Sequence, residues 1–220
     1  AAMSDAEIAG FLRGQSPEAL MAAYQSEAVE GMIDVPQLFR DGAVIPREPI
    51  PELLARGAVH PVPVMLGTNR DENKLFLIFD AELARWWFGL VPSLRDPVRY
   101  EAVAEAMGRW WKATAADGPA RDLTAAGRGP VFVYRFDWDE EPNLFLLADL
   151  AKLVGAAHGF EIPFVFGHWD LGPMSRRLFT SANVGGREVL SDQMMSYWAQ
   201  LAYAGARGRG RSGDLPEWSA

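Results

Sequence analysis

Two short apolar runs, each followed by a polar loop, constrain the fold of this chain more than any other feature. Val62–Leu66 reads VPVML and ends at Gly67, and Val131–Phe136 reads VFVYRF after Pro130. Such β-branched and aromatic runs predict strands, and the first is typical of a strand buried on both faces. Helical patterns separate the two runs, so we expect an α/β fold with parallel central strands.

Helix signals flank the predicted strands. Ser4–Glu7 has the form of a capping box, Ser16–Glu18 opens a second helix, and Asp96-Pro97 caps a longer one. The last long helix is predicted from about Arg187 to Ala204, because its apolar residues recur on one face and Gly205 offers a C-terminal stop.

Three other segments carry weaker signals. Asp41-Gly42 is a turn dipeptide, and its apolar flanks predict a small hairpin or paired extended segment over Val35–Ile45. Lys74–Leu90 is aromatic and helical in tendency, whereas Asp117–Gly129 is interpreted as a glycine-rich turn. Since two strands do not make a sheet, we expect that part of the sheet lies outside this chain.

Charge and composition exclude several classes of function. The chain has 21 Lys and Arg against 29 Asp and Glu, and this formal net charge of −8 disfavours a nucleic-acid partner. No uninterrupted apolar stretch approaches the roughly 18 residues of a membrane span, so we expect a soluble protein. The chain contains no Cys, which removes disulfides, thiolate catalysis and cysteine metal sites but leaves the compartment open.

The chain has three histidines, and the general base in hydrolytic chemistry near neutral pH is usually a histidine. His158 lies in the predicted loop Gly155–Gly159, whose small residues leave room for a substrate. Taken alone, a loop histidine is more often a solvated side chain than a catalytic one. His60 precedes a proline at the start of a strand and His168 lies in a Gly-His-Trp-Asp loop, so we interpret both as structural or surface residues.

A histidine base needs a carboxylate that fixes its tautomer, and Asp71 and Glu72 follow the first predicted strand. If the two strands are parallel neighbours, this acidic loop and the His158 loop leave the same end of the sheet. The alternative is a solvated helix N-terminus, where carboxylates are favoured in any case. For the acidic pair taken alone, that alternative is the better interpretation.

Four sequence blocks resemble one known family. They are the strand and acidic loop Val62–Glu72, the histidine block His158–Gly167, the late helix Met194–Gly205 and the segment Leu215–Trp218. Together they are similar to the C-terminal portion of the type-B carboxylesterases, the α/β-hydrolase group that includes cholinesterases and bacterial carboxylesterases. The resemblance spans most of the chain, and the histidine block is its most specific part. The absence of Cys favours a bacterial type over the disulfide-bearing animal members.

The resemblance implies an α/β-hydrolase fold, with a mostly parallel sheet and flanking helices, in which residues 1–220 are the C-terminal portion of one catalytic domain. Glu72 matches the triad acid and His158 the triad base. The family nucleophile is a Ser in a G-x-S-x-G turn, which this chain lacks, and the order Ser, acid, His places it before residue 1. No HGG-type oxyanion segment occurs either, so we expect these 220 residues to be inactive alone.

The implied activity is hydrolysis of carboxylic esters through an acyl-enzyme, with no metal and no organic cofactor. The implied partners are a small-molecule ester and the missing N-terminal portion of the same domain. The alternative is a catalytically dead relative that acts as an adhesion or interaction module. Retention of both Glu72 and His158 favours the enzyme.

Further positions qualify the resemblance. Asn73 stands where the family often has Gly after the acid. Glu161, three residues after His158, is interpreted as a helix-start carboxylate that supports the loop rather than as a metal ligand. Five aromatic residues are candidates for an acyl or alcohol pocket, although core packing is the better prediction for any one of them: Phe76, Trp86, Trp87, Phe88 and Phe160.

Overall fold

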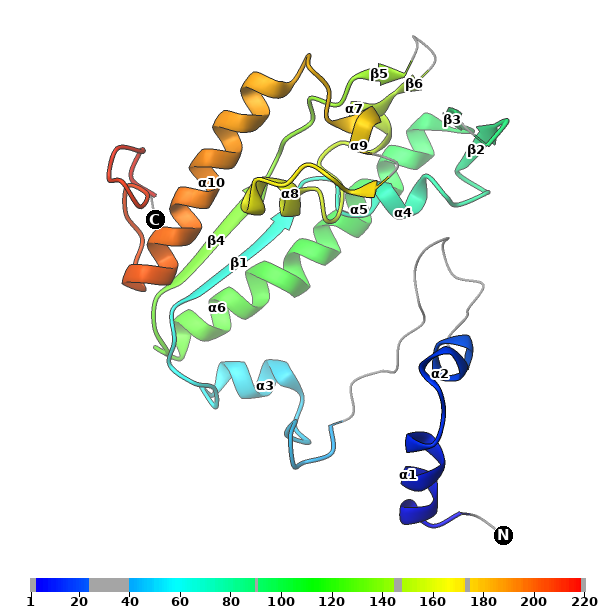
Figure 1. The fold of residues 1–220 in the computed structure, drawn as a ribbon. Coiled ribbons are helices and arrows are strands. Elements are labelled where there is room, and N and C mark those ends of the chain that lie inside the picture. Colours follow the sequence, from blue (N-terminus) through cyan, green and yellow to red (C-terminus); the bar gives the residue numbers. More distant parts are fainter. Residues whose placement is uncertain (1–2, 24–39, 90, 145–147, 173–174, 219–220) are drawn as a thin grey trace. The chain divides into compact units, whose positions relative to one another are not determined.

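A computed structural model describes residues 3–23, 40–89, 91–144, 148–172 and 175–218 (Figure 1). The chain divides into two compact units, Ala1–Arg47 and Glu48–Ala220. The second unit contains all the strands of the described residues, and it carries both Glu72 and His158.

The first unit begins with the two predicted helices, α1 (Asp5–Arg13) and α2 (Pro17–Ala23). The Ser4 hydroxyl accepts the backbone N–H of Glu7, whose carboxylate in turn accepts the backbone N–H of Ser4 at 2.8 Å, so the capping box is confirmed. The Asp41 carboxylate accepts the backbone N–H groups of the next turn, those of Ala43, Val44 and Ile45. The predicted hairpin is wrong over residues 40–45, which bend without forming a strand, and residues 35–39 lie outside the described part.

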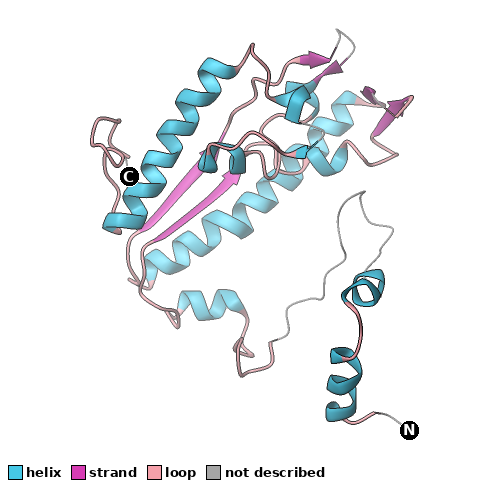
Figure 2. Ribbon diagram, viewed as in Figure 1, coloured by secondary structure: helices cyan, strands magenta, loops and turns pink. Residues whose placement is uncertain are grey.

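The second unit is organised around two parallel strands, β1 (Val64–Asn69) and β4 (Val131–Phe136). Their register runs from Val64 opposite Val131 to Asn69 opposite Phe136. This confirms the predicted parallel pair. Because parallel neighbours need a crossover connection, the intervening chain returns to the start of the sheet through helices (Figures 1 and 2).

Burial along β1 differs from the prediction of a strand covered on both faces. Its first four residues are only partly buried, and Thr68 and Asn69 alone are fully buried. Within the described residues β1 and β4 form a two-stranded sheet, so each has only one strand neighbour. Among the described residues, the faces of β1 are therefore less covered than its apolar composition predicts.

One long helical segment lies along the two strands (Figure 1). It consists of α5 (Pro97–Lys112), a π-helical turn η1 (Ala113–Asp117) and α6 (Gly118–Ala125). The Asp96 carboxylate caps it as predicted, accepting the N–H groups of Val98 and Arg99 at 3.0 Å. The predicted turn over Asp117–Gly129 is wrong, because most of that segment continues the helix; α6 also contacts α3 (Ile50–Ala55).

The helical tendency predicted over Lys74–Leu90 is realised only in a short helix, and two strands of a hairpin follow it. The helix α4 (Lys74–Leu77) is followed by β2 (Ala84–Trp87), which pairs antiparallel with β3 (Val91–Leu94). The Trp86 indole stacks on Phe79 with ring centroids 5.3 Å apart and donates its N–H to the carbonyl of Ile78 at 2.9 Å. Aromatic residues suit a half-buried strand surface, and these contacts override the weak helical tendency.

The remaining elements follow β4. They are β5 (Asn143–Leu144), β6 (Ala148–Asp149), α7 (Leu150–Leu153), α8 (Glu161–Phe166), α9 (Ser175–Leu178) and α10 (Val184–Ala204). As predicted, Gly205 ends α10, in a left-handed conformation with φ 60°. None of the described helices is both long enough and apolar enough to cross a membrane.

The main core lies at the carboxyl end of β4, where α8 and α10 pack together. Its centre is the Phe164 ring of α8, which is fully buried and lies 5.0 to 5.1 Å from the rings of Phe136, Trp138 and Trp169. Such edge-on and tilted ring contacts add to the area that the aromatic residues bury. The core therefore anchors the segment that follows His158.

Candidate active site

Glu72 and His158 follow the carboxyl ends of the two neighbouring strands. Glu72 lies three residues beyond the end of β1, and His158 lies in the loop between α7 and α8, after β4 and its short hairpin. The Nδ1 atom of His158 is 2.8 Å from Oε2 of Glu72. The structure thus brings together the two residues that the sequence selected, at the sheet end where the parallel pairing places both loops.

The two side chains have opposite exposure. The Glu72 side chain is 6% exposed, whereas that of His158 is 47% exposed. The second carboxylate oxygen of Glu72, Oε1, accepts the backbone N–H of Asn69 at 2.7 Å. The carboxylate is therefore held on both oxygens, while the imidazole keeps an open side.

The pKa of His158 is raised above its usual 6.5, chiefly by the hydrogen bond to Glu72 and further by the negative charges of Glu72 and Glu161. Partial burial acts in the opposite direction but is outweighed. A histidine in this setting accepts a proton more readily than a free one. This is the property required of a general base that passes through an imidazolium.

Backbone contacts tie the two loops together. The N–H of Asp71 donates to the carbonyl of Ala156 at 3.0 Å, and the Asp71 carboxylate accepts the N–H of Ala156 at 3.2 Å. The same carboxylate is paired with Arg70 and Lys74 at 2.9 and 3.2 Å. Asp71 therefore anchors the histidine loop, and Glu72 is the acid that contacts His158.

The small residues before His158 pack inside the protein. Ala156 and Ala157 have no exposed surface, so they do not provide the room for a substrate that the sequence suggested. Their size instead lets the loop lie directly on the core.

Two aromatic rings lie beside the imidazole. The ring centroids of Phe76 and Trp111 are 5.6 and 5.1 Å from that of His158. Phe76 is among the predicted pocket candidates, while Trp111, near the end of α5, had no sequence signal beyond its helix. The site thus combines one carboxylate–imidazole pair with an apolar border.

The other pocket candidates lie elsewhere. Phe160 is buried in the core and Trp86 packs on Phe79, in agreement with the core alternative. Phe88 is 96% exposed at the hairpin turn. The Cζ atom of Arg85 lies over the Trp87 ring, 4.5 Å from the ring centroid.

The remaining predicted positions have structural surroundings. His60 and His168 are exposed, as expected of surface residues. Asn73 adopts an ordinary right-handed conformation with φ −90°, so an Asn at this position introduces no backbone strain. Glu161 is the first residue of α8 and its carboxylate accepts the side-chain N–H of Asn69, which agrees with a helix-start residue that supports the loop.

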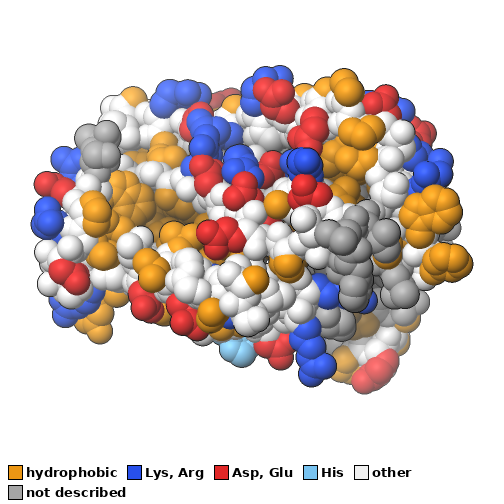
Figure 3. All heavy atoms as spheres, turned by 90° about the horizontal axis from the view of Figure 1, so that it is seen from above, with side chains coloured by type: hydrophobic (Ala, Val, Ile, Leu, Met, Phe, Trp, Pro, Cys, Tyr) orange, Lys and Arg blue, Asp and Glu red, His pale blue; other side chains and the backbone are white. Residues whose placement is uncertain are grey.

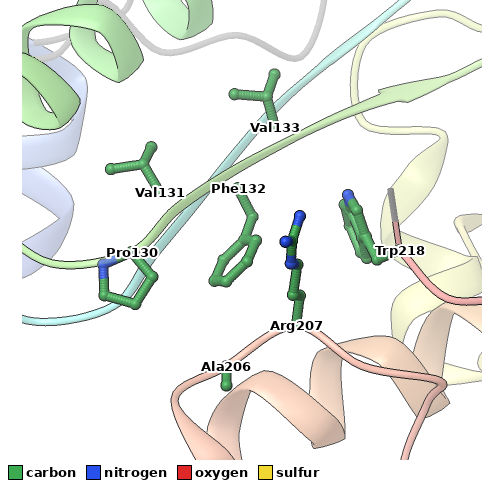
Figure 4. Close-up of a pocket in the computed structure, with 7 residues that line it drawn as sticks. All are labelled: Pro130, Val131, Phe132, Val133, Ala206, Arg207 and Trp218. Atoms are coloured by element: carbon green, nitrogen blue, oxygen red, sulfur yellow. The ribbon is translucent and has the colours of Figure 1, made fainter. Parts of the chain in front are cut away.

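A hollow of about 610 Å³ lies beside the start of β4, away from this pair. It is lined by Pro130–Val133, Ala206, Arg207 and Trp218, with the Phe132 and Trp218 rings on either side of Arg207 (Figure 4). Because it lies at the amino end of β4, whereas Glu72 and His158 follow the carboxyl ends of the strands, it is not part of the site.

The surface charge is mixed. Arg70–Asp139 and Arg135–Asp137 are examples of exposed pairs of opposite charge. Acidic and basic side chains are interspersed on the face seen in Figure 3. A face of this kind lacks the continuous positive potential that binds a phosphate backbone.

Comparison with known proteins connects the chain to esterases. It is 29% identical over 96% of its length to cocaine esterase of Homo sapiens, 27% identical over 92% to pyrethroid hydrolase Ces2e of Rattus norvegicus, and 27% identical over 90% to para-nitrobenzyl esterase of Bacillus subtilis. The chain spans only 40 to 43% of the lengths of these relatives. No family model matches it. The chain is thus similar over most of its length to ester hydrolases of the carboxylesterase type, from mammals and a bacterium alike.

Proposed function

We propose that these residues are the C-terminal portion of a serine carboxylesterase with the α/β-hydrolase fold, to which they contribute the triad acid Glu72 and the triad base His158. The observation that carries the proposal is the 2.8 Å contact between Nδ1 of His158 and Oε2 of the buried Glu72, on loops beyond two parallel strands. The similarity to esterases over most of the chain supports it.

The geometry defines the part each side chain plays. An ionised carboxylate only accepts hydrogen bonds, so Nδ1 of His158 carries the N–H that faces Glu72 and the lone pair is on Nε2. The ring is half exposed. A serine from the upstream portion attacks the ester carbonyl carbon while Nε2 takes the serine proton. The imidazolium that forms is stabilised by the adjacent Glu72 carboxylate.

The proton taken up by His158 is used in the steps that release the two products. Nε2 of His158 returns it to the departing alcohol as the ester bond breaks, leaving the acyl group on the serine. Water, deprotonated by the same nitrogen, attacks the acyl carbon and releases the acid and the free serine. Phe76 and Trp111 border the imidazole with apolar surface, which suits an ester with an apolar acyl or alcohol group.

The upstream sequence and a covalent label test the proposal. We expect a G-x-S-x-G turn in the polypeptide before residue 1, and we expect a fluorophosphonate to label that serine in the full-length protein together with loss of ester hydrolysis. His158→Ala should abolish rapid labelling. Replacement of the serine by a residue without a nucleophile, with partner binding but no hydrolysis, would instead establish the interaction module.

A further inference from the structure

Asn69, the last residue of β1, contacts both loops of the site. Its side chain is buried, and its backbone N–H donates to Oε1 of Glu72 at 2.7 Å. Its side-chain Nδ2 donates to the carbonyl oxygen of Ala157 at 2.7 Å and also to Oε2 of Glu161. A single residue thus binds the acid, the residue before His158 and the residue three positions after it.

We propose that Asn69 is a positioning residue that fixes the separation and alignment of His158 and Glu72. The inference rests on the proposed function of this pair, because alignment matters only if His158 transfers protons. Asn69 then affects the rate of proton transfer by His158, in addition to being the last residue of β1.

The chemistry of the amide fits this task. Asn carries two N–H protons on one nitrogen, and the two atoms facing Nδ2 are a carbonyl oxygen and a carboxylate oxygen, which both accept. This pair of acceptors determines which end of the amide faces the loop. The Oδ1 atom is buried without a hydrogen-bond partner among the described residues, so the side chain is held here through its donors.

The three hydrogen bonds act on different parts of the pair. The bond from the backbone N–H occupies Oε1 of Glu72 and leaves Oε2 for His158. The two bonds from Nδ2 hold the loop on both sides of His158, which keeps Nδ1 aimed at Oε2. A displacement of about 1 Å in such a reacting group costs up to about 100-fold in rate.

The electrostatic effect of Glu161 has to be separated from this geometric one. Its negative charge contributes to the raised pKa of His158, although less than Glu72 does. In Glu161→Gln the side chain keeps an amide oxygen that accepts from Nδ2 but loses the charge. In Glu161→Ala both the acceptor and the charge are lost.

The test uses four single variants of the full-length polypeptide: Asn69→Ala, Glu161→Gln, Glu161→Ala and the control Asn73→Ala. Asn73 is the same residue type, is equally buried four positions further along the chain, and its Nδ2 has no hydrogen-bond partner among the described residues. Active-site titration with a fluorophosphonate corrects kcat for the folded fraction. The pH profile of kcat/KM reports the pKa of His158, and the low-field proton resonance of its Nδ1–H reports the bond to Glu72.

We expect Asn69→Ala to lower kcat per titrated site by about 10- to 100-fold with little change in KM. In the Asn69→Ala variant, the pKa of His158 should move down towards 6.5, and the low-field resonance of Nδ1–H should weaken or shift. Glu161→Gln should lower the pKa while plateau kcat stays within about threefold, because its acceptor remains. Asn73→Ala should retain the wild-type kcat and pKa.

Two results would overturn the proposal. One is an Asn69→Ala protein with the wild-type plateau kcat, pKa and resonance and only a lower melting temperature, which would show a purely structural residue. The other is a Glu161→Ala protein that matches Glu161→Gln in kcat and in the Nδ1–H resonance, because the hydrogen bond from Asn69 to residue 161 would then have no effect on the pair. This result is informative even if Asn69→Ala does not fold. If the wild type hydrolyses no ester, the proposed function fails, and the Nδ1–H resonance still decides whether Asn69 orders the pair.

Discussion

Substitutions of His158 and Glu72 should lower ester turnover by different factors, because the two side chains have different proposed roles. His158→Ala removes the proposed base and should lower ester turnover by the full-length protein on the order of 10⁶-fold, with the fold intact. Glu72→Gln keeps the shape of the acid, but its amide N–H favours the tautomer protonated on Nε2, so the loss should be smaller, on the order of 10⁴-fold. Steady-state kcat/KM with an activated ester measures both.

His168→Ala is the matched control for this comparison. His168 is exposed, and its removal should leave turnover unchanged. A His158→Ala protein with activity near that of the wild type would show that another group is the base.

Glu141 predicts a pH dependence of stability that is separate from the chemistry. Burial is the main reason that the pKa of this carboxyl is raised to about 8, with further contributions from Asp139 and Asp71. Both carboxyl oxygens are buried without a partner among the described residues. Since the folded-state pKa lies above the unfolded value near 4.5, the folded protein holds the proton more tightly, and stability falls as the pH rises through this interval.

Glu141→Gln should remove that fall. We expect it to stabilise the full-length protein by roughly 1 to 3 kcal/mol at pH 9 and to have little effect at pH 4, as measured by denaturant unfolding. Glu140→Gln, at the exposed neighbouring position, should leave the pH dependence intact. Equal pH curves for the wild type and Glu141→Gln would show that Glu141 ionises normally.

At the scale of elements, Gly67 determines how closely β1 and β4 pack. It lies opposite Tyr134 in the register, and a Cβ added there would be 2.0 Å from the Cε1 and Cζ atoms of the tyrosine ring. That ring also packs edge-on against Trp198 of α10, with centroids 4.8 Å apart, so it cannot move without disturbing the helix. Gly67→Ala should therefore cost about 1 to 3 kcal/mol of unfolding free energy.

The same substitution in α5 provides the contrast. A Cβ at Gly108 would meet only the Arg70 carbonyl oxygen, at 3.7 Å, which is an ordinary contact. Gly108→Ala should stabilise the protein by about 0.5 to 1 kcal/mol, because Ala is the better helix former. Denaturant unfolding of both variants checks the pair, and a neutral Gly67→Ala would show that the Tyr134 ring yields easily.

The elements that local patterns predict correctly are those whose signals are self-contained. The β4 run, the capping box at Ser4 and the glycine stop at Gly205 each depend on neighbouring residues only. The hairpin of β2 and β3 was missed because its stability comes from Trp86 contacting Ile78 and Phe79, outside its own strands. The helix through α6 was missed because its Gly118-Pro119 start looks like a turn, although proline suits a first helical turn.

At the scale of the whole molecule, the site residues also differ in whether local sequence or distant contacts identify them. Glu72 and His158 were selected because the blocks Val62–Glu72 and His158–Gly167 resemble a known family, since their residue types and their place after strands alone favoured the structural alternatives. Asn69 was not, since its importance comes from contacts with Ala157 and Glu161, 88 and 92 positions away in the chain. Such contacts exist only after β1 and β4 have paired.

The two-stranded sheet leads to the last prediction, which concerns the 220 residues as an isolated protein. Apolar surface remains open along the pair: Val64–Gly67 are only partly buried and the Val133 side chain is 39% exposed. Each strand has one outer edge without a strand neighbour among the described residues, and exposed apolar edges favour aggregation.

We therefore expect the isolated 220 residues to aggregate or to behave as a molten state, with weak near-ultraviolet circular dichroism and no cooperative melting transition, and to hydrolyse no ester. Under the proposed function, the full-length polypeptide should melt cooperatively and hydrolyse esters, because the proposed upstream portion would supply the nucleophile and cover the open surface of β1 and β4. Co-expression of the upstream portion with the 220 residues as separate chains is the decisive control, since it should restore both properties. If the isolated chain melts in one sharp transition with native near-ultraviolet signals, its own core suffices, and the open edges of the sheet then belong to an independent domain.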